Sequence, residues 1–190
     1  MNFTKYVPNS QIKKLKYTYR NSQELIDIST KFVMKNKSQI KKKLLSHKYL
    51  DKPIEFIYYI NPYIVFKKLY NKLKKENNDL LILGRNNFDI NKFSKEEIKE
   101  FLSVHSSKGL EAENVILINL TDGLYGFPNK IINSKLIEEL HPSDKTYLYA
   151  EERRLFYVAL TRTRNKVYIL VPFFNKSIFI KELKKIMHFK

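Results

Sequence analysis

The stretch Asn114–Leu120, NVILINL, is a nearly continuous apolar run of strand length. A strand that faces solvent on one side alternates apolar and polar residues, whereas a strand buried on both faces does not. A second run of this kind, LLIL at residues 80–83, ends at Gly84. Strands buried on both faces are typical of parallel sheets covered by helices. The two runs therefore predict an α/β fold.

Segments with helical periodicity alternate with further β-rich runs on both sides of these two strands. Helices are expected over residues 22–46, 62–76, 94–101, 149–163 and 177–186. Additional strands are expected over residues 54–60, 102–105 and 167–171. The alternation predicts a mainly parallel sheet with helices on both faces, and ligands in such folds bind beyond the carboxyl ends of the strands.

The composition excludes several classes of protein. A chain with 43% hydrophobic residues can bury a core, so it is not wholly disordered. The absence of cysteine excludes disulfides and thiolate metal sites, and the four histidines are scattered singly, so no metal site is predicted. No apolar run approaches the ~20 residues that a membrane span needs. We therefore expect a soluble, cytoplasmic chain with no membrane partner.

The charge is strongly positive, with 36 basic and 19 acidic residues and a net charge of +17. A field of this sign attracts polyanions such as nucleic acids. The alternative is that the abundance of lysine and asparagine reflects AT-rich codons and has no functional meaning. The arginines are more informative because they are few and clustered: Arg20, Arg85, Arg153, Arg154, Arg162 and Arg164.

A first polar cluster, Ser103–Glu111, follows directly after an expected strand. Gly109 would let the backbone approach a ligand closely, and Glu111 could accept a hydrogen bond from a sugar hydroxyl. The alternative is an ordinary polar loop.

A second cluster, Glu151–Arg164, lies on an expected helix. On a helical wheel, Arg154 lies opposite the broad apolar arc, whereas Arg153 lies at its edge. Arg154 is therefore free to point into a cleft, and Arg153 is expected to pair with a nearby carboxylate. The alternative is an acidic helix start followed by solvated arginines.

A third cluster, Tyr17–Ser22, places an aromatic residue and an arginine just before a helix that Ser22 can cap. Tyrosine can stack on a base, and arginine can hold a phosphate with two parallel hydrogen bonds. The alternative is a loop aromatic packed on the edge of the sheet. No phosphate-binding G-x-x-x-x-G-K-[ST] motif occurs in the chain.

Taken together and in this order, the clusters resemble the second motor domain of superfamily 1 DNA helicases of the UvrD/Rep type, and its DNA helicase IV branch in particular. Tyr19-Arg20 resembles the "YR" motif of this family, and residues 81–87 resemble its strand ending in arginine. Ser103–Glu111 is similar to motif V, T-x-H-x-x-K-G-L-E. Glu151–Arg164 resembles motif VI, E-E-R-R-L-x-Y-V-A-x-T-R-A.

The resemblance implies a RecA-like (P-loop NTPase-like) three-layer α/β/α domain over residues 15–190, after a lead-in over residues 1–14. This domain lacks its own Walker A motif. ATP and Mg²⁺ would be bound mainly by an N-terminal RecA-like motor domain of the same full-length protein. The DNA partner would be single-stranded or duplex.

The resemblance also implies roles for individual residues. Tyr19 would stack on adenine, Arg20 would reach the γ-phosphate, and Glu111 beside Gly109 would hold the ribose. Arg154 would be the arginine finger, so Arg154 and Arg20 are the catalytic candidates. The residues expected to contact DNA are Arg85, Asn87, Ser103, His105 and Arg162.

Three positions depart from the family pattern. Ser103 stands where threonine is usual, and Thr163 stands where alanine is usual. Gly84-Arg85-Asn86 departs from the usual aromatic or small residue before the arginine. The DNA contact expected at Arg85 can therefore differ in detail from that of the family.

The leading hypothesis is the C-terminal motor domain of an ATP-dependent DNA helicase, inactive as an ATPase by itself because Walker A and Walker B are absent. One alternative is a stand-alone basic nucleic-acid-binding module without ATP dependence. Another is a protein-interaction scaffold that uses the fold without nucleic acid. Sensitivity to ATP separates the first two.

Overall fold

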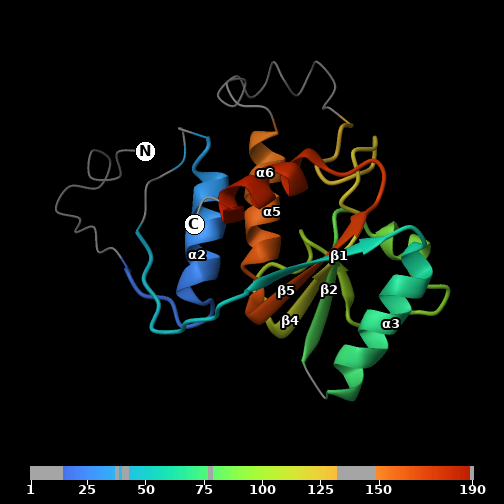
Figure 1. Ribbon diagram of the computed structural model, residues 1–190, viewed down its shortest axis with the longest axis horizontal. Coiled ribbons are helices and arrows are strands. Elements are labelled where there is room, and N and C mark those ends of the chain that lie inside the picture. The colour runs from blue at the N-terminus through green and yellow to red at the C-terminus, as the bar shows by residue number, and fades with distance from the viewer. Residues whose placement is uncertain (1–14, 37–38, 40–42, 77–78, 132–148, 189–190) are drawn as a thin grey trace.

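The computed structural model describes residues 15–36, 39, 43–76, 79–131 and 149–188 (Figure 1). Within these ranges five strands form one parallel sheet in the order β1-β5-β4-β2-β3. The strands are β1 (Ile54–Tyr59), β2 (Leu80–Gly84), β3 (Phe101–Ser103), β4 (Ala112–Leu117) and β5 (Thr163–Pro172). The helical elements are α2 (Gln23–Val33), α3 (Pro62–Lys75), the 3₁₀ turn η1 (Asp89–Lys92), α5 (Ala150–Leu160) and α6 (Ile178–His188). The predicted α/β class is confirmed.

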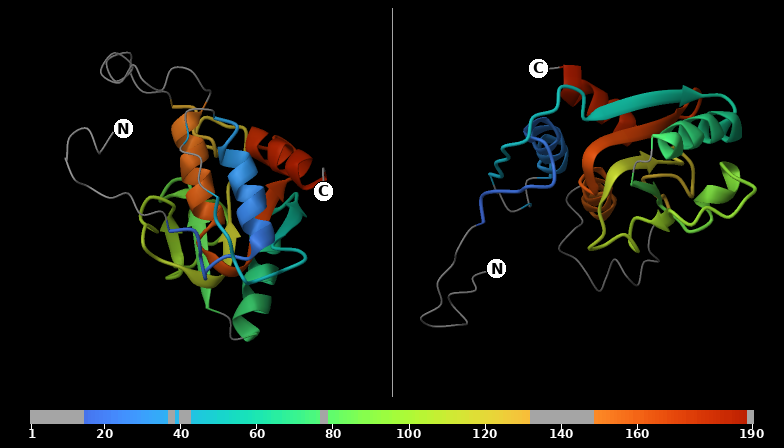
Figure 2. Two further views of the ribbon diagram at one scale, coloured as in Figure 1. Left: turned by 90° about the vertical axis from the view of Figure 1, so that its left-hand side faces the viewer. Right: turned by 90° about the horizontal axis from the view of Figure 1, so that it is seen from below.

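Helices cover both faces of the sheet, with α2, α5 and α6 on one face and α3 on the other (Figures 1 and 2). Successive residues of the central strands point to opposite faces. Leu81 and Leu83 therefore belong to the core under α2, α5 and α6, whereas Leu80 and Ile82 belong to the core under α3. This alternation explains why the run is apolar at every position, and it confirms the three-layer prediction.

Phenylalanine rings fix how the three helices pack on their face of the sheet. Phe32 of α2 contacts Phe156 of α5 and Phe179 of α6, with ring centroids 5.1 and 5.3 Å apart. Phe127, from the loop after β4, contacts Phe156 at 5.3 Å. All four side chains are almost completely buried. The helix that carries Arg154 is thus anchored to its two neighbours and to that loop.

Two predicted helices are wrong in extent or existence. The helix expected over 22–46 ends at Val33, and residues 37–38 and 40–42 of that prediction lie outside the described residues. Leu45 instead exchanges backbone hydrogen bonds with Lys16 and Thr18 at 2.8 and 2.9 Å. Local periodicity could not predict this pairing of distant segments.

The helix expected over 94–101 does not form. Phe93 is buried against α3, with its ring 6.2 Å from that of Phe66. The carbonyl of Glu100 accepts a hydrogen bond from the Ile82 amide at 2.9 Å, which draws the next residues into β3. Tertiary anchoring at both ends keeps this segment out of a helix.

The remaining elements differ from the predictions mainly at their ends. The expected strands 102–105 and 167–171 are observed as Phe101–Ser103 and Thr163–Pro172. The expected helix 149–163 ends at Leu160, because Thr161 and Arg162 form a turn and Thr163 begins β5. The predicted Ser22 cap is confirmed, since the Ser22 hydroxyl accepts from the Leu25 backbone amide. In the structure Asn61 caps α3 ahead of Pro62 in the same way.

Candidate functional site

The segment around Arg20 lies against the amino-terminal ends of β4 and β5. Arg20 Nε donates to Glu111 Oε2 at 2.5 Å, although the two residues are 91 positions apart. The buried side-chain amide of Asn21 donates to the backbone carbonyls of Thr161 and Thr163 at 3.3 and 2.7 Å. Parts of all three polar clusters therefore meet at this edge of the sheet.

Glu111 is held by two arginines. Arg164 Nη1 donates to its Oε1 at 3.2 Å, while Arg20 binds the other oxygen. The hydrogen bond from Arg20, followed by that from Arg164, lowers the pKa of Glu111 below its ordinary value. The carboxylate is thus kept ionised, as an acceptor for hydroxyl groups requires.

Arg164 is a residue whose role was missed in the sequence analysis. Besides Glu111, its guanidinium binds Glu113 and Asp79, each at 2.8 Å. Hydrogen bonds from Glu113 and Glu111 raise its pKa above the ordinary arginine value. The available signal was that all three carboxylates precede or open a strand, because the amino-terminal ends of parallel neighbours lie close together.

Arg162 belongs to the same edge. Its Nε donates to the carbonyl of Val158 and its Nη1 to that of Leu110, both at 3.2 Å. Burial, and then the charge of Arg20, lower the pKa of Arg162. Two guanidinium groups that repel each other attract an anion between them. The structure thus places Arg162 with Arg20 and Glu111, although it was expected to contact DNA.

Two other predicted residues are sequence neighbours of this ion pair: Tyr19 precedes Arg20, and Gly109 lies two positions before Glu111. The Tyr19 side chain is 84% exposed, so its ring is accessible for stacking. Gly109 is exposed and has φ +87°, a left-handed conformation that favours glycine. This conformation turns the chain between β3 and Glu111.

The two arginines of α5 have opposite environments. Arg153 is buried between the rings of Phe32 and Phe179, 5.1 and 5.0 Å from their centroids. It binds Glu182 with two hydrogen bonds of 2.8 and 2.6 Å, which confirms that it pairs with a carboxylate. Arg154 is 37% exposed and forms an ion pair with Glu151 at 2.9 Å. Arg154 lies near the start of α5, whereas Arg162 follows its end.

A second group of predicted residues lies at the carboxyl ends of β2 and β3. Arg85 follows β2 and binds Glu152 of α5, with Nε 2.9 and 3.0 Å from the two carboxylate oxygens. The Ser103 and Ser106 hydroxyls are 2.9 Å apart, and His105 and Asn87 are exposed. The structure thus separates the predicted residues into two groups at opposite edges of the sheet. Arg154, two residues after Glu152 on α5, lies towards this second group and not beside Arg20 and Glu111.

The turn after β2 explains the unusual glycine before Arg85. A Cβ atom on Gly84 would lie 2.9 Å from the Cβ of Asp89, which is completely buried. The Asp89 carboxylate accepts from the Asn86 amide at 2.9 Å and from the Asn119 side chain at 2.7 Å. Glycine is therefore required for close packing, and the Asp89 contacts fix the turn that presents Arg85.

Exposed aromatic residues near this edge were also missed. Phe173 and Phe174 follow β5 and are 53% and 74% exposed. The ammonium of Lys176 lies 5.3 Å from the ring centroid of Phe173 and 5.6 Å from that of Tyr58. Two adjacent phenylalanines directly after the strand-ending Pro172 were the signal in the sequence.

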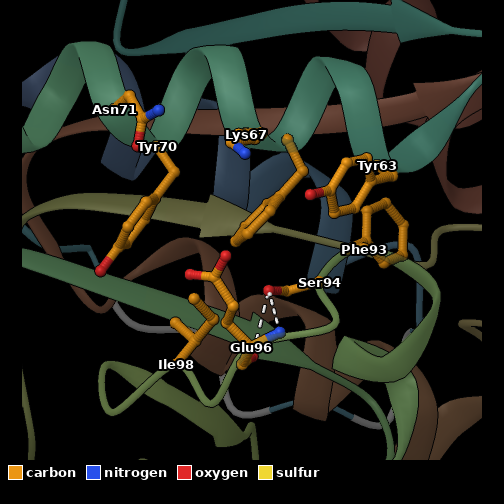
Figure 3. Close-up of a pocket in the computed structure, with 9 residues that line it drawn as sticks. Tyr63, Lys67, Tyr70, Asn71, Phe93, Ser94, Glu96 and Ile98 are labelled. Carbon is orange, nitrogen blue, oxygen red and sulfur yellow. Dashed lines mark hydrogen bonds between the residues drawn. The ribbon is translucent and has the colours of Figure 1, made fainter.

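A small pocket lies elsewhere, between α3 and the segment that follows η1 (Figure 3). Tyr63, Tyr70 and Phe93 line it. Its polar groups interact locally, as Ser94 does with the backbone of Glu96 at 3.0 and 3.1 Å. None of the predicted site residues lines this pocket.

In the described part of the chain, no set of three or more histidine or acidic side chains is arranged to bind a metal ion. Across the same residues, no helix is both long and apolar enough to cross a bilayer.

The parallel five-stranded sheet and its two helical layers define a RecA-like α/β domain. Residues 98–172 match the UvrD-like helicase C-terminal domain family. This matched part of the chain belongs to that family.

Individual relatives are consistent with this assignment. DNA helicase IV of Escherichia coli K12 is 31% identical over 176 residues, which cover 89% of this chain and 26% of the relative. ATP-dependent DNA helicase Rep of Buchnera aphidicola is 38% identical over 80 residues, which cover 42% of this chain and 10% of the relative. The chain thus spans about a quarter of the length of DNA helicase IV.

A solved structure supports the fold. The C-terminal domain of a "possible DNA helicase" from Lactobacillus plantarum WCFS1 aligns with a TM-score of 0.53 and 13% sequence identity. The alignment covers 87% of this chain and 94% of that domain.

Proposed function

We propose that this domain is the C-terminal motor half of an ATP-dependent DNA helicase that moves along single-stranded DNA. It would contribute one wall of an ATP site, and the other wall would come from an N-terminal RecA-like domain of the same protein. The observation that carries the proposal is the meeting of Arg20 with Glu111, next to Arg162, at the amino-terminal edge of β4 and β5.

On the nucleotide side, Tyr19 would stack on adenine and Glu111, with Gly109 beside it, would hold the ribose hydroxyls. Arg20 would reach the γ-phosphate when the two motor domains close. Arg154 is the arginine finger that the family resemblance implies, but it lies near the start of α5, on the side of Arg85, so the test below decides its role. Arg162 lies on this side of the sheet, which favours a role near the phosphates over a DNA contact. ATP supplies the reacting phosphoryl group, and Mg²⁺ would be bound mainly by the other domain.

On the DNA side, Arg85, Asn87, Ser103 and His105 would contact the strand beyond the carboxyl ends of β2 and β3. Phe173 and Phe174 offer exposed rings for base stacking, and the nearby Lys176 can neutralise a phosphate. ATP and DNA would then bind at opposite edges of one sheet. Motions of this domain on ATP binding and hydrolysis would shift the bound strand.

The test uses the complete helicase polypeptide with Arg154→Ala. An arginine finger contributes about 10³–10⁵-fold to the rate of phosphoryl transfer. We expect ATP hydrolysis to fall by at least about 10³-fold while the affinity for single-stranded DNA changes by no more than a few-fold. Lys185→Ala, which removes a cation from the exposed side of α6, should leave both quantities unchanged. Loss of DNA binding with retained ATP hydrolysis would show that Arg154 is not the finger.

A further inference from the structure

The guanidinium of Arg85, the proposed DNA contact after β2, is already bound to a carboxylate of α5. Arg85 Nε lies 2.9 Å from Glu152 Oε1 and 3.0 Å from Glu152 Oε2. Arg85 Nη2 lies 2.8 Å from the same Oε1. This is the planar, forked geometry with which arginine also binds a phosphate. A phosphate and Glu152 would therefore compete for the same face of Arg85.

We propose that Glu152 is a positioning residue that competes with the DNA phosphate for Arg85 and couples strand binding to helix α5. The inference rests on the proposed DNA contact at Arg85. In the absence of DNA, Glu152 holds the guanidinium in place. A bound phosphate takes over the guanidinium and releases the carboxylate.

Burial makes this ion pair stronger than an ordinary surface pair. The side chains of Arg85 and Glu152 are only 21% and 13% exposed. Charges at such positions are screened less by water and salt than charges on the open surface. Removing one partner leaves the other partly desolvated and in need of a counter-charge. A phosphate can supply that charge to Arg85.

Glu152 is itself held in place by the loop after β4. Its Oε2 accepts a hydrogen bond from the Asn129 amide at 2.8 Å. The Asn129 side chain donates to Asn86 Oδ1 at 3.2 Å, next to Arg85 in the chain. The end of β2, the loop after β4 and the first turn of α5 are thus joined through one carboxylate.

Because Glu152 belongs to α5, competition for Arg85 also acts on this helix. Glu152 lies in the first turn, where the helix dipole favours a negative charge. Arg154, the proposed arginine finger, lies two residues further along the same turn. Release of Glu152 from Arg85 frees the first turn of α5 from its contact with the end of β2. A phosphate at one edge of the sheet can therefore affect the helix that carries the finger.

The test measures binding of a fluorescent oligothymidylate to the 190-residue chain by anisotropy over a range of salt concentrations. The variants are Glu152→Gln, Arg85→Gln and the double variant. The Glu152→Gln substitution keeps the size of the side chain and one acceptor oxygen while removing the charge that competes with phosphate. Glu97→Gln, at an exposed position before β3, is the control for an equal change in net charge.

Glu152→Gln is expected to tighten binding about two- to fivefold, the effect of one partly exposed ion pair. The slope of log K against log salt should steepen by about 0.7, equivalent to one additional phosphate contact on a single strand. Arg85→Gln should weaken binding, and Glu152→Gln should have no further effect in that background. Glu97→Gln should leave the slope unchanged.

The inference is overturned if Glu152→Gln behaves like Glu97→Gln, or if its gain persists without Arg85. It is also overturned if Glu152→Gln weakens binding and lowers the thermal unfolding midpoint, because the pair is then only structural. Absence of binding by every form of the chain would contradict the proposed DNA contact itself. That result differs from DNA binding that is present but unchanged by Glu152→Gln, which would contradict only the role of Glu152.

Discussion

The two consecutive arginines of α5 show how one helical turn separates structural and functional roles. Arg153 points into the core, where two aromatic rings enclose its guanidinium and Glu182 neutralises it. Arg154 points to the partly exposed side of the helix. A rotation of 100° per residue accounts for the difference. Substitutions of the two arginines should therefore affect different properties of the protein.

Glu182→Gln should lower the free energy of unfolding of the chain by about 3 kcal/mol at pH 7, because Arg153 would remain buried without the charge of Glu182. Burial raises the pKa of Glu182, but hydrogen bonds from Arg153 and Lys35 outweigh it, and the net pKa lies below the ordinary value of 4.5. The stabilisation is therefore complete above pH 4.5 and is lost as the pH falls through the lowered pKa of the folded state. Urea unfolding at several pH values measures it.

The matched control for this prediction is Glu97→Gln, the same substitution at an exposed position. It should change the free energy of unfolding by less than about 0.5 kcal/mol. A destabilisation by Glu182→Gln that did not shrink towards acid pH would contradict the ionic explanation.

Gly84→Ala should destabilise the chain by about 2 kcal/mol, because the new methyl group would overlap the buried Asp89 side chain. Gly123→Ala is the natural control, since the nearest atom to its Cβ would be 3.7 Å away. We expect Gly123→Ala to be neutral within about 0.5 kcal/mol. Equal effects of the two substitutions in chemical denaturation would show that the turn after β2 tolerates a side chain.

At the scale of elements, the segment before α2 is positioned by the turn between α5 and β5. The Asn21 amide binds two carbonyl oxygens of that turn, and Arg20 then reaches Glu111. Leu45 fastens the same segment on its other side through its backbone bonds to Lys16 and Thr18. The proposed nucleotide contacts Tyr19 and Arg20 are thus placed by tertiary contacts rather than by a regular element.

Asn21→Ala should release this segment. The loss of two buried hydrogen bonds is expected to cost about 1–2 kcal/mol and to expose the backbone near Arg20. Limited trypsin digestion should then cut at Arg20 faster than in the unchanged chain, while the core helices stay protected. Asn71→Ala removes an exposed side-chain amide of α3, on the opposite face of the sheet, so it should not accelerate cleavage at Arg20. Unchanged cleavage in Asn21→Ala would mean that other contacts hold the segment.

At the scale of the whole molecule, the sheet separates the two groups of proposed ligand contacts. Arg20, Glu111 and Arg162 lie at the amino-terminal ends of its strands, and Arg85 and His105 follow the carboxyl ends. The segment from Val104 to Glu111 runs from one edge to the other, because it joins the end of β3 to the start of β4. One domain can therefore contact two ligands without either contact obstructing the other.

The isolated chain should bind single-stranded DNA with a strong salt dependence and should not hydrolyse ATP. Its charge of +17 favours phosphate contacts, whereas the phosphate-binding loop of an ATPase is absent from its sequence. Anisotropy with oligothymidylate and a phosphate-release assay measure the two properties. ATP hydrolysis by the highly purified chain, abolished by Arg154→Ala, would contradict the proposed division of labour. If the complete polypeptide bound DNA with the same affinity in the presence and absence of ATP, the result would favour a simple nucleic-acid-binding module.

The sequence by itself determined the α/β class, the continuous burial of the central strands and the pairing of Arg153 with a carboxylate. These features depend on local periodicity and on which residues are apolar, so they are visible in short windows. The motifs around Tyr19, Ser103 and Arg154 were likewise recognisable from residue type and spacing.

Only the tertiary structure decided the strand order, the early end of α2, the absent helix before β3 and the partners of the arginines. Each of these depends on contacts between residues far apart in the chain. Arg20 meets Glu111 and Arg85 meets Glu152 because the order of the strands brings their ends together. Local propensity carries no information about that order, and for this reason the division of the site between two edges of the sheet became visible only in the folded molecule.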